Sequence, residues 1–489
     1  MRRLLAILFV TLGIALGGCG SHSVSCDPAS QKTAVNQLMS SWYLYPDLLV
    51  SVDPNDPANP TVQAYLDALT ATARSQGMDR GWTYATTTAQ QQAFFAQGTA
   101  VGFGVSLLGR KDASQALHVF VSQVFGGSPA ELAGFKRGDE ILAVGDTPTT
   151  LVTVQALIAG ATPPVTTEAD AAGVVAAALG PSTAGLTKSI QVMPRGGTTP
   201  ADVAVRTVTK STFSLDPVPQ GAVLMPQGTG GPPIGYVALR SFITPAEALL
   251  TTAFQQLRTA GVQEVIVDLR YNGGGLVETA DVLANLLGGA RTTADVMFSL
   301  TNNPMHLDQN ETVLWAPQPQ SIAPLRVAFI TTGATASASE LVPNALEPYL
   351  APPGGAPNIA LVGAKTYGKP VGQRGFTMQA CGTVVYLVSL KIVNSEDEGG
   401  YYQGLPDAAG AFAGPLCQAP DDLTHDTWDQ AEASTAAALS WLATGSCPAP
   451  AVATLSARAA ALAQGAPGED VYPEAAEPDL AQRHVRGLF

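Results

Sequence analysis

The sequence is poor in charged and aromatic residues. Only 13% of its 489 residues are charged and 7% are aromatic, whereas a typical soluble domain has about 25% charged residues. Basic residues are the scarcer kind: 25 Lys and Arg stand against 39 Asp and Glu, so the formal net charge is −14. Nucleic acid is therefore not an expected partner, because phosphates bind to basic surfaces and bases stack on aromatic side chains.

Several catalytic and cofactor motifs are also missing. The sequence has no H-E-x-x-H for a metallopeptidase, no G-x-S-x-G for a Ser-His-Asp hydrolase and no C-x-x-C for a redox or zinc site. Neither phosphate-binding glycine pattern occurs in its required strand-to-helix context. We therefore expect no metal, nucleotide or organic cofactor. None of the histidines stands in a triad context, and only His306 is a candidate to check; the five are His22, His118, His306, His425 and His484.

The apolar run near the N-terminus is too short to cross a bilayer. Residues 4–16 form a run of 13 after two arginines, whereas a spanning helix needs about 20. The pattern is typical of an export signal, and residues 16–19 (Leu-Gly-Gly-Cys) resemble the lipobox of bacterial lipoproteins. By this resemblance, residues 1–18 are a signal peptide and Cys19 is lipidated. Gly20 in place of an aspartate then favours the outer membrane of a bacterial envelope, facing the periplasm. A plain secretory signal with a chance cysteine is the alternative.

Four cysteines remain after Cys19. In an exported chain they are expected to form two disulfides, with three alternative connectivities. We favour Cys381–Cys417 together with Cys26–Cys447, because the second bond would join the two ends of the folded body.

Periodicity divides the chain into three kinds of region. Around residues 36–96 the pattern is helical, with apolar residues on one face of residues 62–73. From residue 101 the chain turns to short strands and glycine turns. After about residue 235 strands and helices alternate, which predicts a mostly parallel sheet covered on both faces.

The middle region closely resembles a bacterial PDZ domain. The resemblance is carried by the order of a glycine-rich loop at 101–105, strands near 117–124, 188–193 and 203–209, and a helix over 167–179. By that resemblance, the backbone of the loop binds the free carboxylate of a polypeptide, whose tail adds as a strand to the sheet edge. The expected peptide-binding residues are Gly102, Phe103, Gly104 and Val105.

Three segments of the last region carry candidate chemistry. Residues 268–275 (D-L-R-Y-N-G-G-G) leave a buried strand through glycines whose amides can face a ligand. Residues 335–341 (T-A-S-A-S-E-L) lie between a strand and a helix. Residues 366–373 (T-Y-G-K-P-V-G-Q) follow the next strand. Taken alone, Ser337 or Ser339 is as easily a helix N-cap as a nucleophile.

Together these segments resemble the C-terminal processing (tail-specific) serine peptidases. That family has a protease core of crotonase-like fold with an inserted PDZ domain, and the three patterns occur here in the family's order. The resemblance implies that Ser337 is the nucleophile, Lys369 the general base and Gln373 the residue that orients the lysine. The amides of Gly274 and Ala338 would form the oxyanion hole. The implied reaction is endoproteolysis of a protein or peptide near its free C-terminus.

This resemblance completes the expected architecture, a multidomain α/β chain with an N-terminal helical region. Its segments are a signal peptide (1–18), a tether with the helical region (19–97), a PDZ domain of β-sandwich or barrel type (98–212), a serine protease core (213–448) and an Ala/Pro-rich tail (449–489). Two stretches depart from the family pattern, an insertion at 351–357 and an irregular acidic stretch at 396–404.

Two other functions stay open from the sequence. One is a lipid-anchored PDZ adaptor with an inactive core, against which the presence of Ser337, Lys369 and Gln373 argues. The other is a crotonase-fold enzyme for acyl thioesters, in which the PDZ region and the Ser/Lys pair would have no role.

Overall fold

The computed structural model describes residues 25–227, 230–351, 354–407 and 411–449. The predicted signal peptide, Cys19, His22, His484 and all but the first residue of the predicted tail lie outside these ranges. None of the helices within them combines the length and the apolar character that crossing a bilayer requires.

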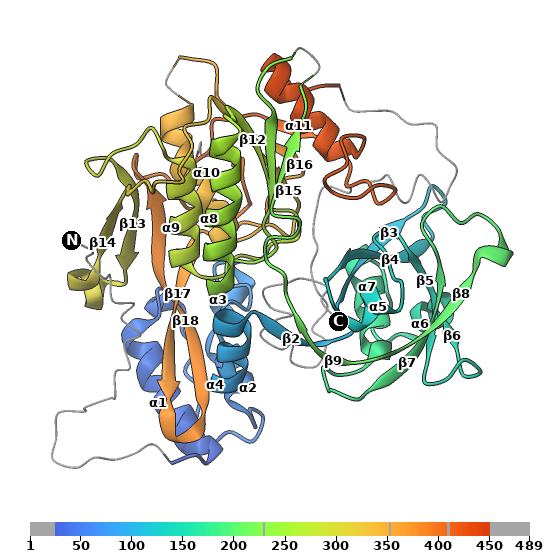
Figure 1. Ribbon diagram of the computed structural model, residues 1–489. Helices are drawn as coiled ribbons and strands as arrows, with labels where there is room; N and C mark the ends of the chain where they lie inside the picture. The colour runs from blue at the N-terminus through green and yellow to red at the C-terminus, as the bar shows by residue number, and fades with distance from the viewer. Residues whose placement is uncertain (1–24, 228–229, 352–353, 408–410, 450–489) are drawn as a thin grey trace. The chain divides into compact units, whose positions relative to one another are not determined.

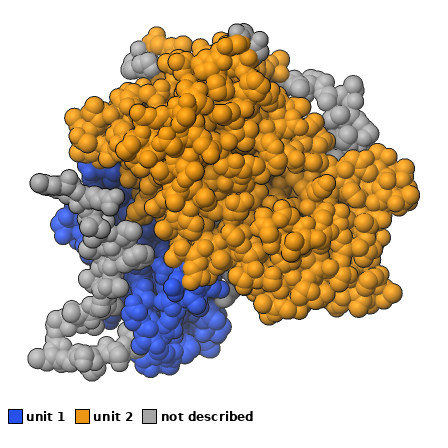
Figure 2. All heavy atoms as spheres, in the orientation of Figure 1, with its two compact units in different colours: residues 1–92, 298–313, 370–393 blue, residues 93–297, 314–369, 394–489 orange. Residues whose placement is uncertain are grey.

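The chain folds as two compact units (Figure 2). Unit 1 combines the chain up to residue 92 with residues 298–313 and 370–393, and unit 2 contains residues 93–297, 314–369 and the chain from residue 394. Unit 1 therefore takes two segments from the stretch 213–448 that the sequence analysis assigned to the core.

Helices and an antiparallel sheet make up unit 1. Its main elements are α1 (Pro28–Trp42), α2 (Val62–Leu69), α3 (Ala71–Ser75), β1 (Tyr84–Thr87), α4 (Thr88–Gln91), β17 (Val371–Met378) and β18 (Thr383–Asn394). The periodic face predicted within residues 62–73 is confirmed, since Tyr65, Leu66 and Leu69 of α2 are buried. The region is not purely helical, however, because β1 pairs antiparallel with β18.

All four remaining cysteines form disulfides, but the pairing favoured from the sequence is wrong. Cys26 bonds to Cys381, and Cys417 bonds to Cys447. Cys26 precedes α1 and Cys381 lies in the turn between β17 and β18, so the first bond joins two parts of unit 1. Cys417 lies on strand β19 (Leu416–Gln418) and Cys447 follows helix α11 (Ala433–Thr444), which packs against that strand in unit 2.

The PDZ-like region of unit 2 has the elements expected from the sequence. One sheet has the order β3-β4-β5-β7-β8, with β3 at its edge. The strands are β3 (Val105–Lys111), β4 (Leu117–Val124), β5 (Glu140–Gly145), β7 (Thr187–Met193) and β8 (Ala204–Thr209), and the helices are α5 (Pro129–Leu132), α6 (Val154–Gly160) and α7 (Glu168–Leu179). The apolar faces of β3 and α7 share one buried core.

The rest of unit 2 is built on a six-stranded sheet in the order β10-β11-β12-β15-β16-β19. All pairs are parallel except β10 with β11. Helices α8, α9 and α10 lie together on one side of this sheet and α11 on the other (Figure 1), so the predicted two-sided cover is confirmed. The strands of this sheet not yet given are β10 (Ala222–Met225), β11 (Ile234–Ala238), β12 (Glu264–Asp268), β15 (Arg326–Thr331) and β16 (Ile359–Gly363). The three helices on one side are α8 (Thr244–Thr259), α9 (Val277–Leu287) and α10 (Ala338–Leu350).

Candidate active site

The three candidate segments leave the carboxyl ends of neighbouring parallel strands. The glycine loop follows β12, the serine segment follows β15, and the segment that contains Lys369 follows β16. Because β12, β15 and β16 are adjacent in the sheet, the three loops emerge at the same edge. This is the edge at which open α/β sheets bind ligands.

The glycine loop packs directly against the serine segment. A Cβ added to Gly274 would lie 2.8 Å from Cβ of Ser337 and 3.0 Å from the amide nitrogen of Ala338. Gly274 also has φ +101°, a conformation that other residues rarely adopt. Only glycine therefore allows this approach, and the predicted oxyanion-hole residues Gly274 and Ala338 do lie next to the predicted nucleophile.

The two serines of the second segment have different environments. The Ser339 side chain is fully buried, and its hydroxyl donates to the carbonyl oxygen of Asn272 at 2.9 Å. Ser337 is partly exposed at the N-cap of α10, with φ +59°. The hydroxyl of Ser339 is thus held in a structural hydrogen bond, whereas Ser337 occupies the strained strand-to-helix turn that is typical of exposed nucleophiles.

One buried carboxylate joins the serine segment to the lysine segment. Glu340 Oε2 accepts the amides of Ser337 and Lys369, both at 2.8 Å. Its Oε1 accepts the amide of Gly368 at 2.7 Å and the hydroxyl of Thr366 at 2.5 Å. Burial raises the pKa of Glu340, while these four donors favour its ionised form. Glu340 was not singled out from the sequence, although a glutamate three residues after a serine at a helix start is the signal of a capping box.

The predicted general base is enclosed. Only 8% of Lys369 is exposed to solvent. The third predicted catalytic residue, Gln373, lies on β17 in unit 1, where its side-chain amide donates to the carbonyl oxygen of Trp82. Its role in orienting Lys369 stays a prediction.

The amide of Gly274 already has an acceptor. It donates to Oδ1 of Asn272 at 2.9 Å, and the Asn272 side chain donates in turn to the carbonyl oxygen of Leu239 at 2.7 Å. An oxyanion would therefore have to share this amide with Asn272 or displace it. The assignment of Gly274 as an oxyanion donor stays a prediction, as does that of Ala338.

The predicted peptide-binding loop is closely packed. Phe103 and Val105 are buried in the hydrophobic core that β3 shares with α7, rather than lining an open pocket. The carbonyl oxygen of Gly104 accepts from the amide of Phe125 at 3.0 Å. Farther along the edge strand, the amide of Lys111 donates to the Glu168 carboxylate at 2.7 Å. A peptide that paired with the amide of Lys111 would have to displace this contact. Gly102 ends the short strand β2 (Thr99–Gly102).

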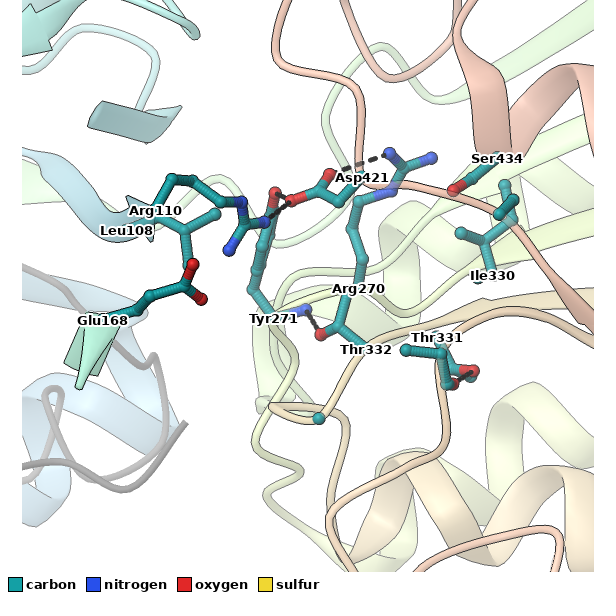
Figure 3. Close-up of a pocket in the computed structure, with 14 residues that line it drawn as sticks. Leu108, Arg110, Glu168, Arg270, Tyr271, Ile330, Thr331, Thr332, Asp421 and Ser434 are labelled. Atoms are coloured by element: carbon teal, nitrogen blue, oxygen red, sulfur yellow. Dashed lines mark hydrogen bonds and ion pairs between the residues drawn. The ribbon is translucent and has the colours of Figure 1, made fainter. Parts of the chain in front are cut away.

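A buried charged cluster stands beside the glycine loop. Figure 3 shows Asp421 between Arg110 and Arg270, at N–O distances of 3.1 and 3.4 Å. Arg137 lies 2.6 Å from the same carboxylate and donates to the hydroxyl of Tyr271 at 2.8 Å. Burial alone would raise the pKa of Asp421, but the three arginines hold it well below its usual range. Arg110 and Arg137 belong to the PDZ-like region, and nothing in the sequence pointed to their distant partner.

The histidine to be checked does not form a triad. His306 Nε2 shares a hydrogen bond with the Ser41 hydroxyl at 3.1 Å, and its ring stacks on Trp42 in unit 1. Within the described ranges, no carboxylate hydrogen-bonds to the other ring nitrogen. No group of three or more His, Cys, Asp or Glu side chains in those ranges is arranged to hold a metal ion.

Two family models match this chain. Residues 233–407 match peptidase family S41, and residues 120–168 match the PDZ domain. A carboxyl-terminal-processing protease of Picosynechococcus is 30% identical over 254 residues, which cover 52% of this chain and 51% of that protein. The chloroplastic carboxyl-terminal-processing peptidase 1 of Arabidopsis thaliana is 27% identical over 59% of this chain and 51% of its own length. The chain thus spans about half the length of the curated relatives it matches.

One solved structure agrees with this fold over most of the chain. A crystal structure described as a putative S41 protease from Bacteroides fragilis has a TM-score of 0.61 and 21% identity, and the match covers 84% of this chain and 97% of that one. The expected fold class, an α/β protease core with a PDZ domain, is confirmed.

Proposed function

We propose that this chain, whose core belongs to peptidase family S41 and which carries a PDZ domain, is a serine endopeptidase that cleaves polypeptides near their C-termini. Ser337 is the nucleophile and Lys369 the general base. The observation that carries the proposal is the shared carboxylate of Glu340, which binds the amides of both residues at 2.8 Å. The relatives named carboxyl-terminal-processing protease or peptidase support the site of cleavage.

In the proposed mechanism, neutral Lys369 accepts the hydroxyl proton of Ser337. The serine oxygen then attacks the scissile carbonyl carbon of the substrate. The carbonyl oxygen becomes negatively charged and accepts hydrogen bonds from the backbone amides of Ala338 and Gly274. Protonated Lys369 gives its proton to the leaving amine. Neutral Lys369 then deprotonates a water molecule, which attacks the acyl-enzyme, and Lys369 returns the proton to the departing Ser337 oxygen. The enclosure of Lys369 supports this role, because burial of an amine favours its neutral form.

Substrate recognition is assigned to the PDZ domain. The C-terminal carboxylate of a substrate binds the backbone of residues 102–105, and the tail adds to β3. The position of β3 at the sheet edge supports this mode, since an edge strand has backbone groups that a further strand can pair with. The contact between Glu168 and Lys111 has to open for the tail to pair along the whole strand.

The anchor of the chain is part of the proposal. Cys19 carries the lipid, which holds the enzyme at a bacterial envelope membrane, outer rather than inner, with the catalytic core in the periplasm. Two disulfides among the four remaining cysteines support an oxidising compartment.

An inactive adaptor is the second candidate. The hydrogen bond between the amide of Gly274 and Asn272 favours it, because an oxyanion-hole donor is then occupied. The inactive form would still bind polypeptide tails through the PDZ domain.

Cleavage of an unfolded protein with an apolar C-terminus separates the two candidates. The wild-type chain should release fragments from the C-terminal end, and Lys369→Ala should release none while its thermal unfolding stays cooperative. Mapping the new C-termini by mass spectrometry gives the site of cleavage. If the wild-type chain binds the protein without cleaving it, the inactive adaptor is the better candidate. If Lys369→Ala cleaves at the wild-type rate, Lys369 is not the general base.

A further inference from the structure

A cavity in unit 2 is markedly basic for so acidic a chain. It has a volume of about 320 Å³ and is lined by residues of the PDZ domain and of the core. Five basic and three acidic side chains line it, a local net charge of +2, whereas the whole chain has −14. The basic residues are Lys136, Arg137, Arg195, Arg240 and Arg270.

Three of the four arginines already have carboxylate partners. Arg137 pairs with Asp421, Arg195 with Asp426, and Arg270 with Asp268. Their charges are balanced within the fold, so these three arginines need no anionic ligand.

Arg240 differs from the other three. Its Nη2 donates to the carbonyl oxygen of Val124 at 3.1 Å, and the guanidinium lies 4.8 Å from the centroid of the Phe125 ring. Its Nη1 is enclosed and has no hydrogen-bond partner in the described part of the chain. Burial lowers the pKa of Arg240, and the neighbouring acids, with Asp216 first, only partly offset this. An enclosed cation held by neutral groups is stabilised by an anion that reaches it.

Arg240 also lies between the two proposed substrate contacts. It follows β11 and precedes Phe242 by two residues, and the amide of Phe242 donates to the carbonyl oxygen of Gly274 at 3.0 Å. Gly274 in turn touches Ser337. On the other side, Val124 pairs with Val105 of the peptide-binding loop.

We propose that Arg240 is the anchor of a carboxylate subsite, which binds a carboxylate of the polypeptide substrate in this cavity. The subsite rests on the proposed peptidase function. The unbonded Nη1 of the Arg240 guanidinium suits a carboxylate oxygen, since hydrogen bonds between a guanidinium and a carboxylate are charge-assisted. The carboxylate comes either from an acidic side chain or from the free C-terminus, and in the second case Arg240 would bind the terminus in place of residues 102–105.

Three matched peptides distinguish these sources. The first has neutral side chains and a free C-terminus, the second is the same peptide with an amidated C-terminus, and the third is the amidated peptide with one glutamate. Cleavage is measured as kcat/KM for the wild-type chain and for Arg240→Gln. If the subsite binds the C-terminus, Arg240→Gln should lower kcat/KM about tenfold for the first peptide, mainly by raising KM. If the subsite binds an acidic side chain, the same loss should occur for the third peptide instead. The second peptide should be unaffected.

The control is Arg258→Gln. Arg258 lies on α8 and donates to the carbonyl oxygen of Ser321, away from the cavity. This variant removes the same charge and should leave kcat/KM unchanged for all three peptides. An equal loss on all three peptides with Arg240→Gln, or no loss on any, would overturn the subsite.

Direct binding separates the subsite from the peptidase proposal. The peptides are titrated calorimetrically into Ser337→Ala, with and without Arg240→Gln. Weaker binding of only a carboxylate-bearing peptide supports the subsite even if the wild-type chain cleaves nothing. If Arg240→Gln fails to fold, Arg240→Lys keeps the charge and should retain part of the preference. Equal affinity of Ser337→Ala for all three peptides overturns the subsite without any substitution at residue 240.

Discussion

Glu340 is the residue on which the geometry of the site most depends. Its carboxylate accepts two backbone amides from the lysine segment and one from Ser337, as well as the hydroxyl of Thr366. A single side chain thereby joins the backbone of the proposed nucleophile to that of the proposed base. Such a residue positions catalytic groups without touching the substrate.

Glu340→Gln should lower kcat while leaving KM nearly unchanged. The amide group of glutamine has one acceptor oxygen, so its NH₂ would face donors that Oε1 or Oε2 now accepts. We expect kcat to fall about 10- to 100-fold, the scale of a small misplacement of reacting groups. Glu347→Gln is the matched control, because Glu347 is a buried acid on the same helix and, among the described residues, accepts one hydrogen bond, from the amide of Ala413. Equal losses in the two variants would mean that Glu340 acts only through the stability of α10.

Glu347 should make the stability of the chain depend on pH. Burial, followed by Glu398 and Glu396, raises its pKa from 4.5 to about 7. The folded chain thus keeps a proton that the unfolded chain releases, and the free energy of unfolding falls as the pH rises from 4.5 to about 7. Glu347→Gln lacks this loss, so its stability relative to the wild type should be higher at pH 8 than at pH 4, by about 1–3 kcal/mol. Urea unfolding of both proteins at both pH values measures this difference, and the same difference at pH 4 and pH 8 would refute the raised pKa.

At the scale of elements, the disulfide between β19 and α11 joins the edge of the core sheet to the helix that covers it. Cys417 and Cys447 are 30 residues apart in the sequence. Closing a loop of that length is worth about 3–4 kcal/mol in the chain-entropy model. The bond therefore restrains α11 against the sheet that carries the three loops of the candidate site.

The double substitution Cys417→Ser/Cys447→Ser should lower the free energy of unfolding by about 3–4 kcal/mol, less whatever strain the bond holds. Denaturant unfolding of the variant and of the wild-type chain measures the loss. Peptide mapping without reductant should still recover the bond between Cys26 and Cys381. Recovery of a bond between Cys381 and Cys417 in the wild-type chain would restore the pairing expected from the sequence.

Local patterns predicted the elements of this chain well, and distant contacts escaped them. The strand over 117–124 and the helix over 167–179 follow from periodicity and glycine turns, and β4 and α7 agree with them closely. The pairing of β1 with β18 joins segments about 300 residues apart. The sequence of neither segment indicates which distant strand it pairs with. The N-terminal region was therefore expected to be helical, without a strand.

The same distinction holds for the site. Ser337 and Lys369 were predicted from their segments, whereas the contact between Arg137 and Asp421 spans 284 residues. The disulfide pairing failed for this reason too, because which cysteines meet depends on how helices pack on strands. Glu340 differs from these missed contacts, because the sequence held a local signal for it: a glutamate three residues after Ser337 at the start of a helix is the spacing of a capping box.

At the scale of the whole molecule, the lipid on Cys19 should decide where the chain is found. In a bacterial host, the wild-type chain should sediment with membranes, and Cys19→Ser should be soluble and equally active, because Cys19 is not one of the proposed catalytic residues. Mass spectrometry of the mature N-terminus checks the modification directly. An unmodified Cys19 behind an intact signal segment would contradict the lipoprotein proposal.

The most direct test of the central claim is to identify the serine that acts as the nucleophile. A phosphonate that reacts only with activated serine hydroxyls is incubated with the chain, and the labelled peptide is located by mass spectrometry. The label should lie on Ser337, and Lys369→Ala should lose it, since the hydroxyl is a weak nucleophile without its base. A label on Ser339, or unchanged labelling of Ser337 in Lys369→Ala, would contradict the Ser337–Lys369 mechanism.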